Sequence, residues 1–166
     1  MNSLIQIKKN KILIRHLRAE DANDNYLKMI TNANKYILSK DKIKNFFHLR
    51  KYIFLKNYSV NQLLFGIFVQ NKHVGNIKFD ILTQGKAILG IFIGNKNYQG
   101  NNLFGIVLKI LEPKLKNIFK INTLYLGVNK NNLPAIKAFK KSGFKIYNWK
   151  GKKIFNQAIM RKNLFR

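Results

Sequence analysis

The residues with the clearest potential for chemistry form a polar loop that leads directly into an apolar segment, NYQGNNLFGIVLKIL at residues 97–111. The apolar side chains that follow Gly100 recur at helical spacing. The first turn of a helix carries backbone N–H groups without intrahelical partners, and the helix dipole adds partial positive charge there. Such a loop can hold a phosphate on its amides. Taken alone, the loop is better explained as an ordinary turn without a ligand, since Gly/Asn turns between a strand and a helix are common.

The elements that must position this loop follow from the pattern of apolar residues. The expected strands are residues 11–17, 63–70, 73–82, 86–94, 121–128, 144–149 and 156–164. The expected helices are residues 19–33, 40–57, 102–119 and 132–143. In the first, one face is expected to carry Leu27, Ile30 and Ala33. In the second, the residues at roughly helical spacing are Ile43, Phe46, Phe47, Arg50, Tyr52, Ile53 and Phe54. Pro113 predicts a kink or break in the third helix, and Gly143 is expected at the C-terminal cap of the fourth.

The order of these elements predicts an α+β (α/β/α) fold with a mixed, mostly antiparallel twisted sheet of about six to seven strands and helices on both faces. The strands at 63–94 form an antiparallel meander, because short polar turns separate them. The strands at 86–94 and 121–128 flank a helix and should be parallel, joined by a right-handed crossover. No composition break suggests a linker, so residues 1–166 are expected to be one domain.

The chain has a formal net charge of +26, from 32 Lys and Arg against 6 Asp and Glu. The basic residues are spread along the whole chain rather than clustered, and Lys, Asn and Ile, which A/T-rich codons specify, are abundant. The charge is therefore read as an aid to anion binding and not as a nucleic-acid-binding function. Cysteine is absent, and no apolar stretch approaches the length needed to span a bilayer, so a cytoplasmic location is expected.

A second segment, NKNNLPAIKAFKKSGFK at residues 129–145, favours phosphate binding by the loop over an ordinary turn. Its pattern Asn–x–x–Ala–x–x–x–aromatic–x–x–x–Gly–Phe resembles the last conserved portion of the GNAT superfamily of acetyl-CoA-dependent N-acetyltransferases. The match comprises Asn132, Ala135, Phe139, Gly143 and Phe144. The resemblance extends along almost the whole chain, through VGNIKF, AILGIFIGNKNYQG and QAIMRKNL. It implies direct transfer of an acetyl group from acetyl-CoA to a primary amine, with the fourth and fifth family strands parallel and splayed.

The resemblance also implies which residues hold the coenzyme. The backbone of Phe92 and Ile93 would pair with the pantetheine arm, Asn132 would hydrogen-bond it, and Ala135 and Phe139 would pack along it. The expected pyrophosphate loop comprises Gln99, Gly100, Asn101, Asn102, Leu103, Phe104 and Gly105. Asn102 and Phe104 stand where the family usually has glycine; Asn tolerates the left-handed backbone, whereas the Phe104 ring must point away from the phosphate. Ala135 and Phe139 also fit a simple core, and Lys137, Lys140 or Lys141 could reach the 3′-phosphate.

The acid and base of the reaction are less evident. Phe139 replaces a tyrosine that protonates the leaving thiolate in many relatives, which leaves Ser142, Tyr147 or water for that role. Ile88 occupies the usual place of a carboxylate. Asp80 is the preferred base, although it fits a turn-capping role equally well. The acids at the first helix, Glu20, Asp21 and Asp24, are expected to serve its N-terminus; His73 is expected in an exposed hairpin turn, and no metal site is predicted.

The acceptor is expected at the first two helices, with Arg18, Asn34 and Tyr36 as candidates that suit a nucleotide or a sugar. Within the family the closest likeness is to members that acylate nucleotide-linked amino sugars, and next to those that acetylate ribosomal protein N-termini. The expected partners are acetyl-CoA and a small-molecule amine, with a homodimer left open and neither membrane nor nucleic acid expected. A non-catalytic acyl-CoA-binding module with a degenerate loop is the alternative from another class.

Overall fold

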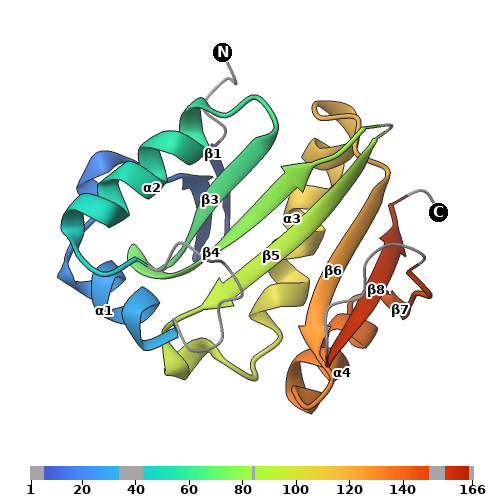
Figure 1. Cartoon of the computed structure of the whole chain (residues 1–166). Coiled ribbons are helices and arrows are strands. Elements are labelled where there is room, and N and C mark those ends of the chain that lie inside the picture. The colour runs from blue at the N-terminus through green and yellow to red at the C-terminus, as the bar shows by residue number, and fades with distance from the viewer. Residues whose placement is uncertain (1–5, 34–42, 84, 150–155, 165–166) are drawn as a thin grey trace. The chain divides into compact units, whose positions relative to one another are not determined.

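The computed structural model describes residues 6–33, 43–83, 85–149 and 156–164. These residues form an eight-stranded sheet with the strand order β1-β2-β3-β4-β5-β6-β8-β7 (Figure 1). The strands are β1 (Gln6–Lys9), β2 (Ile12–His16), β3 (Gln62–Val69), β4 (Lys72–Ile81), β5 (Lys86–Ile93), β6 (Thr123–Asn129), β7 (Lys145–Ile146) and β8 (Gln157–Asn163). The helices are α1 (Asp24–Ala33), α2 (Phe46–Tyr58), α3 (Leu103–Asn117) and α4 (Leu133–Lys141), with short 3-10 turns η1 (Ala19–Asp21) and η2 (Lys96–Tyr98).

The sheet is mixed, as the order of elements predicted. Strands β1 and β2, β2 and β3, β6 and β8, and β7 and β8 pair antiparallel, whereas β5 and β6 are parallel. The parallel register runs from Lys86↔Thr123 to Ile88↔Tyr125, although β5 continues to Ile93 and β6 to Asn129. The α+β class and the parallel pair are confirmed. The additional strand, β1, was not predicted; it turns into β2 through Asn10, whose φ is 53°.

The first expected helix is divided. The η1 turn ends before a new start at Asn23, whose side-chain oxygen accepts a hydrogen bond from the backbone N–H of Tyr26 at 3.1 Å. Tyr26, Met29 and Ile30 then enter the core. Ile30 is buried as expected and Leu27 is half-buried against the core, but the expected face omitted Tyr26 and Met29.

Helix α2 buries only part of the set expected: Ile53 is buried as expected, and Leu49, which that set omitted, is buried with it. Asn45 caps it by accepting from the His48 N–H at 2.9 Å, and Leu49 and Ile53 face the core. Phe47 is 71% exposed, although it was counted with the apolar face. Apolar residues occur on nearly every side of this helix, so the periodicity alone could not choose the buried side.

Helix α3 continues to Asn117, so Pro113 does not break it. Pro113 is exposed, and buried Leu111 and Leu115 hold the helix on both sides of it. Helix α4 ends as predicted at Gly143, whose φ is 88°. The N–H groups of Gly143 and Phe144 bond the carbonyls of Lys140 and Phe139 at 3.0 Å each, which is the Schellman pattern.

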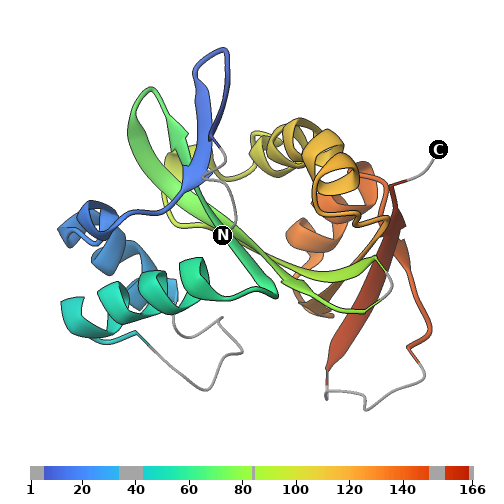
Figure 2. The ribbon, with the colours of Figure 1, turned by 90° about the horizontal axis from the view of Figure 1, so that it is seen from above.

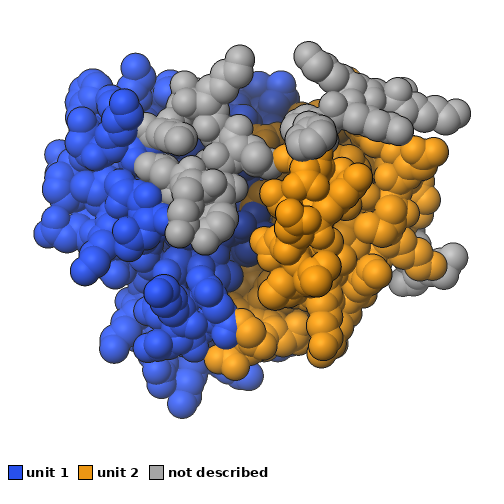
Figure 3. All heavy atoms as spheres, turned by 60° about the horizontal axis from the view of Figure 1, so that its bottom comes forward, with its two compact units in different colours: residues 1–78, 91–99 blue, residues 79–90, 100–166 orange. Residues whose placement is uncertain are grey.

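The chain divides into two compact units, residues 1–78 with 91–99 and residues 79–90 with 100–166 (Figure 3). In the first, α1 and α2 pack with β3 around a buried cluster that includes Tyr26, Leu49 and Phe68. In the second, α3 and α4 lie on one face of β6 and β8 (Figure 2) and cover Leu124, Leu126 and Val128. Among the described helices, none combines the length and apolar character needed to cross a bilayer.

Candidate active site

The loop before α3 has the backbone that an anion site requires. Gly100 and Asn102 both adopt left-handed conformations, with φ values of 80° and 55°, so the expectation that Asn102 can take this geometry is confirmed. The Asn102 side chain does not cap the helix. The first N–H of α3 with an intrahelical partner is that of Ile106, which bonds the Asn102 carbonyl at 3.2 Å. The amides of the three preceding residues are therefore left at the positive end of the helix dipole.

Phe104 does not obstruct this loop. Its side chain is 7% exposed and packs edge-on against Phe139, with ring centroids 5.0 Å apart, and against Phe144 at 6.2 Å. The ring thus belongs to the α3–α4 core and points away from the loop, as the sequence required. The same contacts place Phe139 in that core, where it is buried.

The end of β5 is tied to its neighbours within the first unit. The Gln99 side-chain amide donates to the Ile93 carbonyl at 2.8 Å, which fastens the start of the loop to the last residue of the strand. The N–H groups of Gly94 and Asn95 share the Val74 carbonyl, at 2.9 and 3.2 Å. Phe92 is half-buried, and its ring packs against the α1–α2 core.

The start of α4 is capped by Asn132, whose side-chain oxygen accepts from the Ala135 N–H at 3.2 Å. Asn132 is exposed, and its side-chain amide nitrogen is a hydrogen-bond donor. Ala135 is half-buried. Pro134 follows directly in the first turn, where its missing N–H is not needed.

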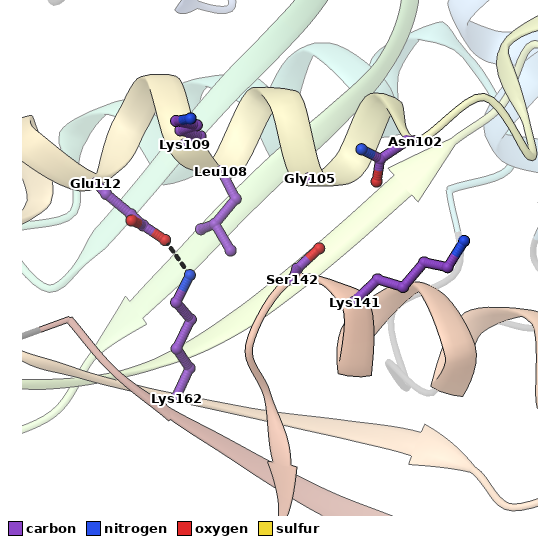
Figure 4. Close-up of a pocket in the computed structure, with 8 residues that line it drawn as sticks. All are labelled: Asn102, Gly105, Leu108, Lys109, Glu112, Lys141, Ser142 and Lys162. Carbon is purple, nitrogen blue, oxygen red and sulfur yellow. Dashed lines mark hydrogen bonds and ion pairs between the residues drawn. The ribbon is translucent and has the colours of Figure 1, made fainter. Parts of the chain in front are cut away.

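A polar pocket of about 320 Å³ lies in the second unit, between α3, the end of α4 and β8 (Figure 4). Asn102 and Lys141 lie at the end of the pocket where α3 begins. At the other end Lys162 pairs with Glu112. The lining residues are Asn102, Gly105, Leu108, Lys109, Glu112, Lys141, Ser142 and Lys162. Cations and hydrogen-bond donors outnumber the single carboxylate, which suits an anion.

The acids do not gather in one place. Asp21 accepts two hydrogen bonds from the Arg15 guanidinium, at 2.6 and 2.8 Å, and one from the Arg18 N–H at 2.6 Å. Burial favours its protonated form, but these donors outweigh that effect and hold the pKa of Asp21 below its usual value. Asp21 therefore forms a largely buried ion pair with Arg15 in addition to its place in η1, which the sequence did not reveal. Asp80 lies half-buried in β4.

His73 was expected in an exposed turn, and that expectation is wrong. It lies in β4, is 6% exposed, stacks on Phe68 at 4.8 Å and meets Tyr26 edge-on at 4.5 Å. Its Nε2 lies 2.9 Å from the Gly75 carbonyl, and because a carbonyl only accepts, Nε2 carries the proton. The turn lies two residues earlier, where Gln70 and Asn71 have φ values of 50° and 63°.

Burial lowers the pKa of His73 to about 4, against the opposing influence of Asp21 and the Gly75 carbonyl. The unfolded chain binds this proton near pH 6.5, so stability is lost as the pH falls from about 6.5 toward about 4. We expect His73 to account for about 2 kcal/mol of the stability lost between pH 7 and pH 5. Urea unfolding at several pH values should show this slope reduced in His73→Phe and unchanged in His48→Phe, which alters an exposed histidine. Equal slopes in all three proteins would contradict the assignment.

Only one of the three residues expected to bind the acceptor lies in the part of the chain that the structure describes. Arg18 is exposed at the N-cap of η1, whereas Asn34 and Tyr36 lie outside the described residues. Within the described ranges, no group of three His, Asp or Glu side chains could hold a metal ion. The sequence predicted neither the burial of His73 nor the contact among the rings of Tyr125, Tyr147 and Trp149. The alternation of side chains between the two faces of β6 could have indicated the aromatic cluster, because Tyr125 follows buried Leu124 and lies on the opposite face.

Comparison with known proteins identifies the class of molecule to which this fold and loop belong. Residues 31–144 match the profile described as the acetyltransferase (GNAT) family. The probable spermine N(1)-acetyltransferase of Bacillus subtilis subsp. natto is 33% identical over 107 residues, which cover 60% of this chain and 68% of that protein. The chain belongs to the GNAT family and is an N-acetyltransferase that uses acetyl-CoA.

Two solved structures share the fold at low identity. The microcin C7 self-immunity acetyltransferase MccE, in complex with acetyl-CoA and AMP, superimposes with a TM-score of 0.78 at 16% identity, over 93% of each chain. The Salmonella typhimurium acetyltransferase that modifies the N-terminal serine of the 50S subunit protein L7/L12 gives 0.77 at 13% identity, over 93% of this chain and 96% of that one.

Proposed function

We propose that acetyl-CoA lies with its pyrophosphate on the amides of Leu103, Phe104 and Gly105 and its pantetheine along the backbone of β5 at Phe92 and Ile93. The left-handed Gly100 and Asn102 support this, because they turn the chain so that the loop enters α3 with its first amides unpaired. The loop residues Gln99, Asn101 and Asn102, and Asn132 with Ala135 and Phe139 on α4, complete the proposed coenzyme site. Lys141, in the adjoining pocket, is the proposed partner of a coenzyme phosphate.

Asn102 offers a direct test of this loop. An Asn102→Val variant should bind acetyl-CoA about tenfold more weakly, because a β-branched residue resists the left-handed φ of 55° by about 1–2 kcal/mol. Asn102→Gly keeps the conformation reachable and should bind almost as the wild type does. Calorimetric titration with acetyl-CoA measures both. Equal affinity in the valine variant would show that the pyrophosphate does not depend on this turn.

Residues 1–166, comprising both units, act in this proposal as one acetyltransferase domain. The amine attacks the thioester carbonyl directly, the carbon–sulfur bond breaks, and the coenzyme thiolate leaves. The amine must lose a proton and the thiolate must gain one. Asp80, which lies half-buried near the end of β4, is the proposed base.

The acceptor that the chain supports best is an amine on an anionic carrier, such as a nucleotide-linked amino sugar. The observation that carries this proposal is the charge, because the chain has 32 cationic side chains and only 6 acidic ones. Two of those acids, Asp21 and Glu112, are already paired with Arg15 and Lys162. Such a field attracts anions and repels polycations. The Bacillus relative is named for spermine, so relatedness and charge point to different acceptors. We give the charge more weight than the relatedness, because acceptor sites change among related enzymes more readily than the coenzyme site does.

A panel of three amines decides between these acceptors. Acetyl-CoA is mixed with a nucleotide-linked 4-amino sugar, with spermidine, or with a peptide that has an N-terminal serine, and released coenzyme thiol is measured. The nucleotide-linked sugar should give the highest kcat/KM, and added salt should lower it by screening the attraction. Preference for spermidine would overturn the anionic acceptor, and preference for the peptide would favour N-terminal acetylation of a protein. Coenzyme binding without turnover on any amine would favour a non-catalytic module.

A further inference from the structure

Three aromatic side chains form a compact cluster in the second unit, formed by β6 and the segment after β7. Tyr125 lies 5.5 Å from Tyr147 and 5.6 Å from Trp149 between ring centroids, and Tyr147 lies 6.3 Å from Trp149. All three pairs meet edge-on, at interplanar angles of 61°, 72° and 67°. The rings support one another in this geometry, while Tyr147 and Trp149 stay partly exposed.

The cluster lies on the face of the sheet that α3 and α4 leave uncovered. Leu124, Leu126 and Val128 are buried, and Lys162, the cross-strand partner of Leu124, binds Glu112 on α3. These strand residues therefore face the helices, and Tyr125 and Gly127, which alternate with them, point the other way. Ile88 is paired with Tyr125 in the parallel register and is 39% exposed. The side chains of Gln157 and Ile159 lie over Gly127 on this face, because a Cβ there would meet their atoms at 3.0 and 3.6 Å.

The charges beside the cluster are positive. The Arg161 guanidinium lies 4.7 Å from the centre of the Tyr147 ring, and Lys145 is the cross-strand partner of Arg161. The neighbouring residue of β8, Lys162, points to the opposite face, where it binds Glu112. On the cluster's own face, the Nε2 of Gln157 is buried and makes no hydrogen bond, so one donor there is unused.

We infer that Tyr125, Tyr147, Trp149 and Arg161, the aromatic platform, bind the nucleoside phosphate portion of the acceptor. A flat base stacks on the exposed rings, as bases do on aromatic side chains, and the guanidinium pairs with phosphate oxygens. Arg161 and Lys145 disfavour a cationic amine at this position, so the platform holds the carrier of the acceptor rather than its reacting group. This inference rests on the proposed function, because it requires an acceptor that carries a nucleotide.

The single tryptophan of the chain makes the platform directly measurable, since fluorescence reports Trp149 alone. Uridine diphosphate is titrated into the protein saturated with coenzyme A, so that the adenine of the coenzyme is already bound at its own site. We expect saturable quenching, and no quenching by inorganic pyrophosphate, which lacks a base. Quenching by coenzyme A that abolishes the response to uridine diphosphate would assign the platform to adenine and overturn the inference.

Matched substitutions test whether uridine diphosphate binding depends on the residues of the aromatic platform or only on the net charge of the protein. Arg161→Gln should weaken uridine diphosphate binding about tenfold. Arg50→Gln removes the same charge from the exposed side of α2 and should have little effect. Tyr147→Ala should weaken binding about tenfold by removing a stacking surface, whereas Tyr58→Ala, on α2, should not. Unfolding curves establish that each variant is folded before it is titrated.

The outcomes distinguish this inference from the proposed function. If the nucleotide-linked sugar is acetylated but Arg161→Gln leaves its KM unchanged, the platform is a structural cluster and only this inference fails. If spermidine or the peptide is the acceptor and uridine diphosphate does not quench Trp149, both fail. A raised KM in Arg161→Gln, with kcat nearly unchanged, supports both.

Discussion

A Gly75→Ala variant is expected to lose about 3 kcal/mol of folding stability and to acetylate its acceptor about a hundredfold more slowly. A Cβ at Gly75 would lie 2.1 Å from the Phe92 carbonyl oxygen and 2.9 Å from the Ile93 Cα. These are backbone atoms, which no side-chain rotation can move aside, so β4 and the end of β5 must separate. The displaced residues are those proposed to pair with the pantetheine arm, and small errors in thioester position are costly to the rate.

The matched control is Gly66→Ala in β3 of the same unit. A Cβ there would meet side-chain atoms of Leu17 and Phe68, at 2.6 and 2.7 Å, and these can shift. This control should therefore lose about 1 kcal/mol and retain most of its activity. Urea unfolding and steady-state kinetics measure both variants. A Gly75→Ala protein with wild-type stability and rate would show that neither folding nor acetylation depends on the present position of β5.

A Phe104→Ala variant should lose about 3–5 kcal/mol of stability, while the acetyl-CoA affinity of the folded protein stays within about threefold. The ring fills the space between α3 and α4 against Phe139 and Phe144, so its removal leaves a cavity in that core. The backbone amides that we propose as phosphate ligands remain in place, because the substitution preserves the helical start. Urea unfolding gives the first quantity and calorimetric titration with acetyl-CoA gives the second.

Phe104→Leu serves as the control, since a branched aliphatic side chain refills part of the cavity and should lose about 1–1.5 kcal/mol. The opposite result would be informative. If Phe104→Ala kept its stability but lost coenzyme affinity by tenfold or more, the ring would contact the coenzyme rather than the α3–α4 core.

Local sequence patterns predicted the elements well where one signal dominated. The polar turns between residues 63 and 94 fixed the meander, and Gly143 marked the end of α4, because left-handed backbone strongly favours Gly. Prediction failed where two patterns competed. Helix α2 is apolar on most sides, so Leu49 was missed in favour of Phe47, and Asn23 restarted α1 where a continuous helix was expected. His73 was misplaced because a shift of two residues in a turn moves a side chain from solvent into a strand.

The sequence by itself determined the family resemblance and the ordered loop and helix, because backbone conformation near glycine and asparagine is a local property. It also determined the excess of positive charge, which needs no folding to be counted. Only the tertiary structure decided which side chains meet. The Phe104–Phe139–Phe144 core, the Arg15–Asp21 and Lys162–Glu112 pairs and the cluster around Trp149 join residues from separate elements. Such contacts depend on how helices and strands pack, and no spacing along the chain encodes them directly.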